Sequence, residues 1–172
     1  MTQHEKKACS YAREKTAQHY AQLIAKDGWT VTHTEGEFTR FDLTITATDG
    51  DTWQTETKIR DIDPYRYINE GAVVDKSKVE YLTRFQKALI VQFFPIVNEV
   101  YIWRLSEKDA WRCKWGYYQK DDYSGEKVYK QVCLLPLDAV HRKHCDMSDY
   151  NNVFQAYKTE FYTTNTTQDY ER

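Results

Sequence analysis

The segment FDLTITATDGDTWQTETKIR, residues 41–60, is typical of a β-hairpin. Two alternating runs flank an Asp-Gly-Asp sequence at residues 49–51, and an Asp-Gly turn between such runs is a strong hairpin signal. Most side chains at odd positions are apolar (Phe41, Leu43, Ile45, Ala47, Trp53 and Ile59). The even positions of both runs are all polar. Because successive side chains on a strand point to opposite faces, we predict one mainly apolar and one polar face.

The register of the hairpin decides which polar residues meet. With a three-residue loop at residues 49–51, Asp42 opposes Lys58, since directly opposed residues of an antiparallel pair share a face. A two-residue turn would send Glu56 to the opposite face and set apolar side chains beside polar ones. We therefore predict the three-residue loop, with a positive φ at Gly50 or the residue after it.

This register brings Asp42, Glu56 and Lys58 together on adjacent strands. Two converging carboxylates suit a hard cation such as Mg²⁺, which prefers oxygen ligands. A nearby lysine can orient a water molecule and offset the charge of a phosphate. Gln54 and Arg60 lie on the same strand face and are candidates to assist.

Asp42, followed after thirteen residues by Glu56-Thr57-Lys58, resembles the D…ExK core of the PD-(D/E)xK nuclease superfamily. The proline of the family name is absent, since Phe41 precedes the aspartate. The resemblance implies that Asp42 and Glu56 bind Mg²⁺ or Mn²⁺, with Lys58 assisting the attacking water. It implies hydrolysis of phosphodiester bonds in nucleic acid, with DNA favoured over RNA, and it allows a homodimer.

The order of the elements supports the resemblance. We predict a helix at residues 4–27, a strand at 29–34 and the hairpin at 41–60. A second helix would begin at residue 75 or 77, and two further strands would follow at 88–94 and 99–105. The strand–helix–strand unit over residues 52–94 predicts two parallel strands. This order resembles the αβββαβ core of the restriction-endonuclease-like fold, an α/β fold with a mixed sheet flanked by helices. In that family a glutamate of the first helix often joins the metal site; Glu14 is the candidate and Glu5 the weaker one.

Basic residues near the predicted site are candidates for nucleic-acid contacts. Arg60 and Arg66 stand at and after the ExK strand, and Lys76 and Lys78 at the start of the second helix. Arginine and lysine can hold phosphates, although such residues often lie on a solvated face. At that helix start, Ser77 with a glutamate three residues on predicts a capping box.

The C-terminal part of the chain is less distinctive. We predict a second hairpin from residues 111–118 and 127–134, a short helix near 138–145 and a polar, flexible tail over 161–172. One nuclease-like domain would then span residues 1–160. The four cysteines form no CxxC pair, which favours reduced thiols.

Composition limits the class of protein. The chain has 172 residues, 41% of them hydrophobic, no long apolar run and an N-terminus without the pattern of a signal peptide. We therefore expect a cytoplasmic protein with no membrane partner. The net charge of −2 argues against non-specific coating of nucleic acid, but it allows a nuclease with a local basic rim.

Two other interpretations of these residues stay open. The domain could be a nuclease-like module that binds nucleic acid or a protein without cutting. Alternatively, Asp42 and Lys58 could form an ordinary cross-strand ion pair on a solvated face, worth a few tenths of a kcal/mol.

Overall fold

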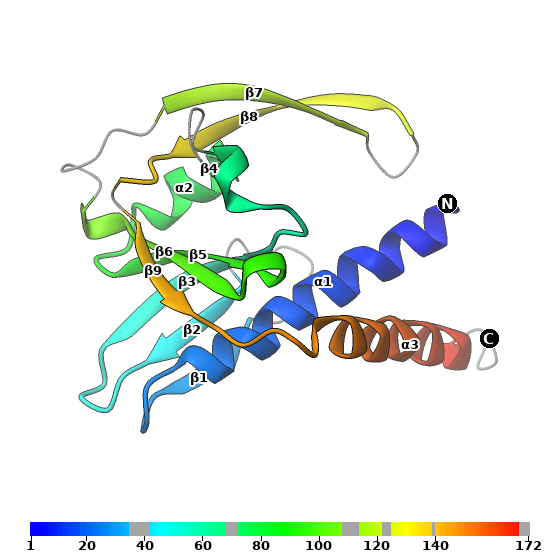
Figure 1. Ribbon diagram of the computed structural model, residues 1–172, viewed down its shortest axis with the longest axis horizontal. Coiled ribbons are helices and arrows are strands. Elements are labelled where there is room, and N and C mark those ends of the chain that lie inside the picture. The colour runs from blue at the N-terminus through cyan, green and yellow to red at the C-terminus, as the bar shows by residue number, and fades with distance from the viewer. Residues whose placement is uncertain (35–41, 68–71, 108–113, 122–124, 139, 169–172) are drawn as a thin grey trace.

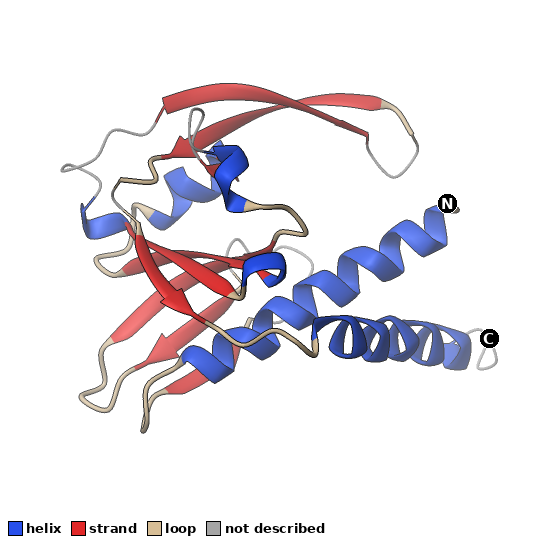
Figure 2. Cartoon of the chain, viewed as in Figure 1, coloured by secondary structure: helices blue, strands red, loops and turns tan. Residues whose placement is uncertain are grey.

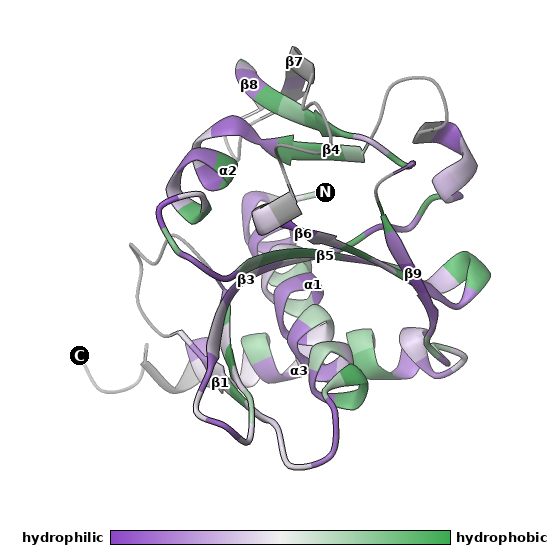
Figure 3. Cartoon of the chain, turned by 90° about the vertical axis from the view of Figure 1, so that its left-hand side faces the viewer, coloured by the Kyte–Doolittle hydropathy of each residue, from purple (hydrophilic) through white to green (hydrophobic). Residues whose placement is uncertain are grey.

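The computed structural model describes residues 1–34, 42–67, 72–107, 114–121, 125–138 and 140–168. Its elements form an α/β arrangement around a mixed central sheet (Figures 1 and 3). Two long helices lie on one side of this sheet, and a short helix with a second, smaller sheet lies on the other. Figure 2 shows how the helices and strands are distributed over these layers.

The central sheet has the strand order β1-β2-β3-β5-β6-β9. Its strands are β1 (Thr30–His33), β2 (Leu43–Thr46), β3 (Thr52–Ile59), β5 (Ala88–Phe94), β6 (Glu99–Arg104) and β9 (His141–His144). Strands β3 and β5 are parallel, and the other neighbouring pairs are antiparallel. The predicted mixed α/β sheet and the parallel pair are confirmed.

The hairpin of β2 and β3 differs from the prediction in its turn. Thr46 pairs with Thr52, and the Ala47 N–H donates to the Asp51 carbonyl at 2.8 Å, so the turn occupies residues 47–51. The Asp49 carboxylate accepts the Asp51 N–H within this turn, and Gly50 has the expected positive φ of 88°. The predicted three-residue loop was therefore wrong: the turn has five residues, and the strand pairing is shifted by two residues. A shift of two leaves the side chains of the paired residues on their predicted faces.

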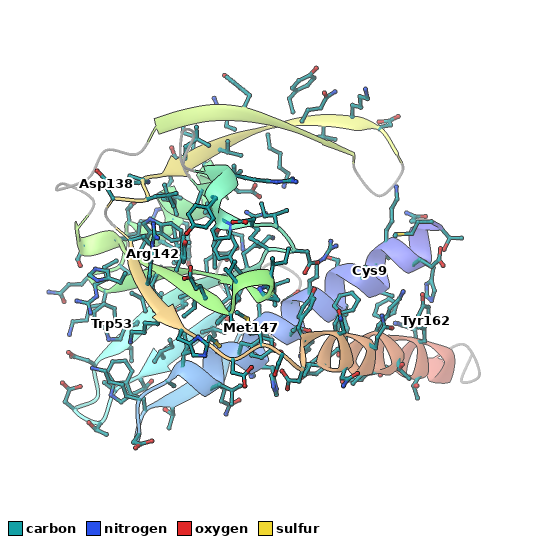
Figure 4. The ribbon with its side chains drawn as sticks, in the orientation of Figure 1. Cys9, Trp53, Asp138, Arg142, Met147 and Tyr162 are labelled. Carbon is teal, nitrogen blue, oxygen red and sulfur yellow. The ribbon has the colours of Figure 1, made fainter. Side chains whose placement is uncertain are left out.

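One face of the central sheet packs against α1 (Gln3–Ile24). Thr2 and Glu5 form a capping box at its start, so Glu5, the weaker metal candidate, caps the helix. The buried core here joins helix and sheet through Ala17, Tyr20, Ala21, Leu43, Ile45, Ile59, Val91, Phe93, Val100, Cys145 and Met147. Figure 4 shows Met147 beside α1, after the end of β9. The apolar face of the hairpin is thus its α1 face.

The opposite face of the sheet packs against α2 (Lys76–Leu82) and a three-stranded sheet of order β4-β8-β7. The strands of that sheet are β4 (Ala72–Asp75), β7 (Lys114–Asp121) and β8 (Lys127–Leu135). Val79 and Leu82 of α2 are fully buried in the core on this side. The N-cap of α2 is Asp75, and Glu80 pairs with Lys76 at 3.6 Å, so the capping box predicted at Ser77 was wrong.

The predicted second hairpin is confirmed by the pairing of β7 with β8, although residues 111–113 lie outside the described residues. It packs beside the central sheet and projects away from the body of the protein (Figure 1). Strand β4, which was not predicted, pairs with β8 and lies inside the crossover between β3 and β5. Cys133 of β8 is disulfide-bonded, which corrects the expectation of a reduced thiol; Cys9 and Cys145 are free.

Two C-terminal predictions were wrong. Residues 141–144 form edge strand β9 in place of a helix, because their backbone pairs with β6. The predicted tail begins inside α3 (Tyr150–Gln168), which packs antiparallel along α1, with both chain ends at the same end of the molecule (Figure 1). The Phe161 ring lies 5.4 Å from that of His4, and Tyr162 of α3 and Cys9 of α1 lie toward that end (Figure 4). Residues 169–172 lie outside the described residues.

Candidate active site

The hairpin places Asp42 and Glu56 level with each other on neighbouring strands. Leu43 pairs with Thr55, so the next position along the register sets Asp42 opposite Glu56, where Lys58 was expected. The Asp42 carboxylate reaches along β3: its Oδ2 accepts the Thr57 N–H at 2.8 Å and the Thr57 hydroxyl at 3.0 Å. These two bonds hold the aspartate in one orientation and leave Oδ1 for another partner.

Glu56 is the buried carboxylate of the site. Its residue is only 7% exposed, because it lies on the sheet face covered by α2. Burial raises the pKa of Glu56 to about 7, and the negative charge of Asp42 adds to the rise. Lys78 opposes the rise, since its ammonium donates to Glu56 Oε2 at 2.9 Å. The charges of Asp42 and Glu56 are therefore close enough to repel each other.

Lys58 and Glu14 complete the cluster. Lys58 is exposed on β3, on the same strand face as Glu56, and its charge lowers the pKa of Glu56 and of Glu14. Glu14 is at the surface of α1, yet partial desolvation of its carboxylate raises its pKa, and the charge of Asp42 raises it further. Thus the charge of Asp42 acts on both predicted glutamates, Glu56 of β3 and Glu14 of α1.

Lys78 belongs to this cluster, although the sequence indicated only a phosphate contact. Desolvation lowers its pKa, but the negative charges of Glu56, Asp42 and Asp75 more than offset this, and the pKa is raised. Its spacing from Glu56 along the chain gave no signal of the pairing. Only the packing of α2 on the sheet turns Lys78 toward β3.

Arg60 and Gln54 already have partners within the fold. Arg60 Nη2 donates to the carbonyl of Val73 at 2.5 Å, and Gln92 Nε2 donates to the same carbonyl at 3.2 Å. This carbonyl belongs to β4, so both side chains tie the two sheets together. Gln54 Oε1 accepts the Thr44 hydroxyl at 2.9 Å, across the hairpin.

The other two basic candidates, Lys76 and Arg66, lie on elements outside the hairpin. Lys76 pairs with Glu80 along α2, and Glu80 is exposed. Arg66 is exposed on a short 3₁₀ helix (Pro64–Tyr67) after β3. The Lys76 side chain is partly exposed to solvent, and that of Arg66 is exposed.

The groups at this site that could hold a divalent cation are its carboxylates. The negative charge of Asp42 raises the pKa of both glutamates, and a bound cation would relieve this repulsion. Asp42 and Glu56 would hold the cation, with Glu14 as a third ligand. Among the described residues, no three His, Cys, Asp or Glu side chains are already arranged around one metal position. Binding of a cation would therefore require side-chain movement.

Comparison with protein-family models, curated proteins and solved structures found no match, so the resemblance is carried by the D…ExK residues and the element order. None of the helices in the described part of the chain is long and apolar enough to cross a membrane.

Proposed function

We propose that this protein is a metal-dependent nuclease of the restriction-endonuclease-like type that hydrolyses phosphodiester bonds. The observation that carries the proposal is the position of Asp42, just before β2 and opposite Glu56 of β3, where its charge raises the pKa of Glu56. Lys58 lies on the same face of β3 as Glu56. Residues of these three types at this spacing were predicted to meet from the alternation of the hairpin. The opposed positions of Asp42 and Glu56 support the proposal, and so does the charge of Lys58, which lowers the pKa of Glu56 and of Glu14.

Each residue has a role that its surroundings allow. Asp42, held by Thr57, and Glu56 would bind Mg²⁺ or Mn²⁺ together with Glu14. When bound, the cation would lower the pKa of a water molecule and stabilise negative charge on the scissile phosphate. Lys58 presents an exposed ammonium that can orient the water or offset phosphate charge.

The preference for DNA over RNA rests on the family resemblance. The net charge of −2 requires the binding energy to come from local basic groups, for which Lys58 and Arg66 are exposed candidates. Arg60 is a weaker candidate in the fold than in the sequence, because its guanidinium already donates to Val73.

Cleavage of a panel of labelled DNA and RNA substrates with Mg²⁺ or Mn²⁺ tests the proposal. We expect Asp42→Asn and Lys58→Met to lower the rate at least about a hundredfold. Lys143→Met is the matched control, since Lys143 is an exposed lysine on edge strand β9. Metal should raise the melting temperature of the wild type and of Lys58→Met, and raise that of Asp42→Asn much less. No cleavage of any substrate and no metal-induced shift would refute the proposal.

A second candidate function is a non-cutting module that binds nucleic acid or a protein. The ion pair of Lys78 with Glu56 favours it, because the ammonium balances the buried carboxylate without a metal. Such a module should bind its partner equally well with and without a chelator, and Asp42→Asn should leave binding unchanged. Metal-dependent cleavage by the wild type would rule this module out.

A further inference from the structure

Lys78 occupies the place at Glu56 where a metal ion would be bound. Its Nζ lies 2.9 Å from Glu56 Oε2, and the two side chains are only 28% and 9% exposed. The neighbouring residue Val79 and Leu82 are fully buried, so α2 is fixed on the sheet and holds the lysine stem against it. The contact therefore follows from packed backbone elements.

An ammonium and a divalent cation compete for such a carboxylate. Both need its oxygens, and two cations placed side by side in a partly buried site repel each other strongly. The negative charge of Asp75 also raises the pKa of Lys78, but the Asp75 carboxylate already accepts a hydrogen bond from the Lys130 ammonium at 3.1 Å. The lysine therefore has its short contact at Glu56, where the carboxylates converge.

We propose that Lys78 is a built-in competitor of the metal: its ammonium fills the cation position at Glu56 and must leave when Mg²⁺ or Mn²⁺ binds. The inference rests on the proposed function for the identity of the ligand. It goes beyond that function because it assigns Lys78 a control over metal affinity. Breaking one charge-assisted hydrogen bond in a partly buried place corresponds to roughly a ten- to hundredfold change in a binding constant.

The test is a Mn²⁺ titration followed by electron paramagnetic resonance, which measures free Mn²⁺ without any substrate. Wild type is compared with Lys78→Met, which keeps an apolar stem but removes the ammonium. Lys78→Gln is the second variant, in case the methionine variant folds poorly, because glutamine keeps a neutral donor for Glu56. Lys76→Met is the matched control, because Lys76 is on the same helix and pairs with Glu80. Titrations at about pH 9 keep Glu56 ionised in every variant.

We expect Mn²⁺ to bind Lys78→Met or Lys78→Gln roughly ten- to a hundredfold more tightly than wild type, with Lys76→Met unchanged. If the wild type binds Mn²⁺ and both Lys78 variants bind it equally or more weakly, the competitor role is overturned and the proposed metal-dependent function is not. Binding by the variants but not by wild type supports the competitor role and refutes the metal-dependent function. No binding by any variant overturns both.

Discussion

Replacing Glu56 by glutamine removes a negative charge from the buried side of the candidate site and keeps the shape of the side chain. The glutamate is only 7% exposed, and both desolvation and the charge of Asp42 disfavour its ionised form. Glutamine resembles the protonated glutamate. We expect Glu56→Gln to stabilise the metal-free fold at alkaline pH, although it removes a ligand that the proposed function requires.

The magnitude follows from the pKa of Glu56. It rises from 4.5 to about 7 in the folded protein, and each pKa unit corresponds to about 1.4 kcal/mol. The folded state therefore binds the proton more tightly than the unfolded chain does. The free energy of unfolding of the wild type should fall as the pH rises from about 4.5 to about 7, and above this range the loss reaches about 3 kcal/mol. The glutamine variant escapes this loss.

Urea unfolding with a chelator present, at about pH 4 and about pH 8, measures the effect. At the higher pH we expect Glu56→Gln to raise the free energy of unfolding by about 3 kcal/mol, or the melting temperature by roughly 6–12 °C. At the lower pH the two proteins should be alike, because the glutamate is then mostly protonated in both states. Glu80→Gln is the control, since Glu80 is exposed and pairs with Lys76 along α2; its effect on the free energy of unfolding should stay within about 0.5 kcal/mol.

A glutamine variant that is less stable than wild type at the higher pH would refute this reasoning. It would mean that the pairing with Lys78 outweighs desolvation and the repulsion by Asp42. An equal gain at both pH values would show that packing, and not charge, explains the change. Adding Mg²⁺ should narrow the difference at the higher pH, because the cation stabilises the wild type more than the variant.

Two further substitutions test whether Thr57 positions the Asp42 carboxylate and whether Arg60 stabilises the fold. Thr57→Val removes the 3.0 Å hydroxyl bond to Asp42 but keeps the 2.8 Å backbone bond, and it should weaken Mn²⁺ binding about tenfold in a calorimetric titration. Unchanged affinity would show that the backbone bond alone positions the aspartate. Arg60→Met breaks the bond to Val73 and should lower the free energy of unfolding by about 1–3 kcal/mol, measured with urea. Unchanged stability, with a salt slope of nucleic-acid binding smaller by about 1, would instead favour a phosphate contact.

Predictions from local sequence patterns were confirmed in the hairpin, where both strands follow the same alternation of apolar and polar side chains. Alternation in the hairpin put Leu43 and Ile45 on one face, which packs on α1, and Glu56 and Lys58 on the opposite face, as the structure confirms. The turn was two residues longer than predicted, because Asp49 and Gly50 satisfy the backbone within it. Since the side-chain period is two, this error kept the paired residues on their predicted faces but changed the residue opposite Asp42 from Lys58 to Glu56.

Predictions failed where a distant element determines the local structure. Residues 141–144, HRKH, have no strand pattern, yet their backbone completes the edge of the sheet beside β6. The polar end of α3 is helical as far as Gln168, and the helix packs along α1 with Phe161 against His4. Neither pairing is encoded within the segment itself, because each depends on the partner surface that the rest of the fold supplies.

The types of residue at the site, and the strand face that carries them, follow from the sequence alone. Alternation and the D…ExK spacing are enough, because a strand has only two faces and a hairpin brings its own strands together. The cations that meet these carboxylates depend on the tertiary structure. Lys78 reaches Glu56 and Arg60 turns to Val73 only because α2 and β4 pack on the sheet, and burial there raises the pKa of Glu56. Desolvation and long-range ion pairing arise from the packed arrangement of several elements, and no spacing within one segment specifies them.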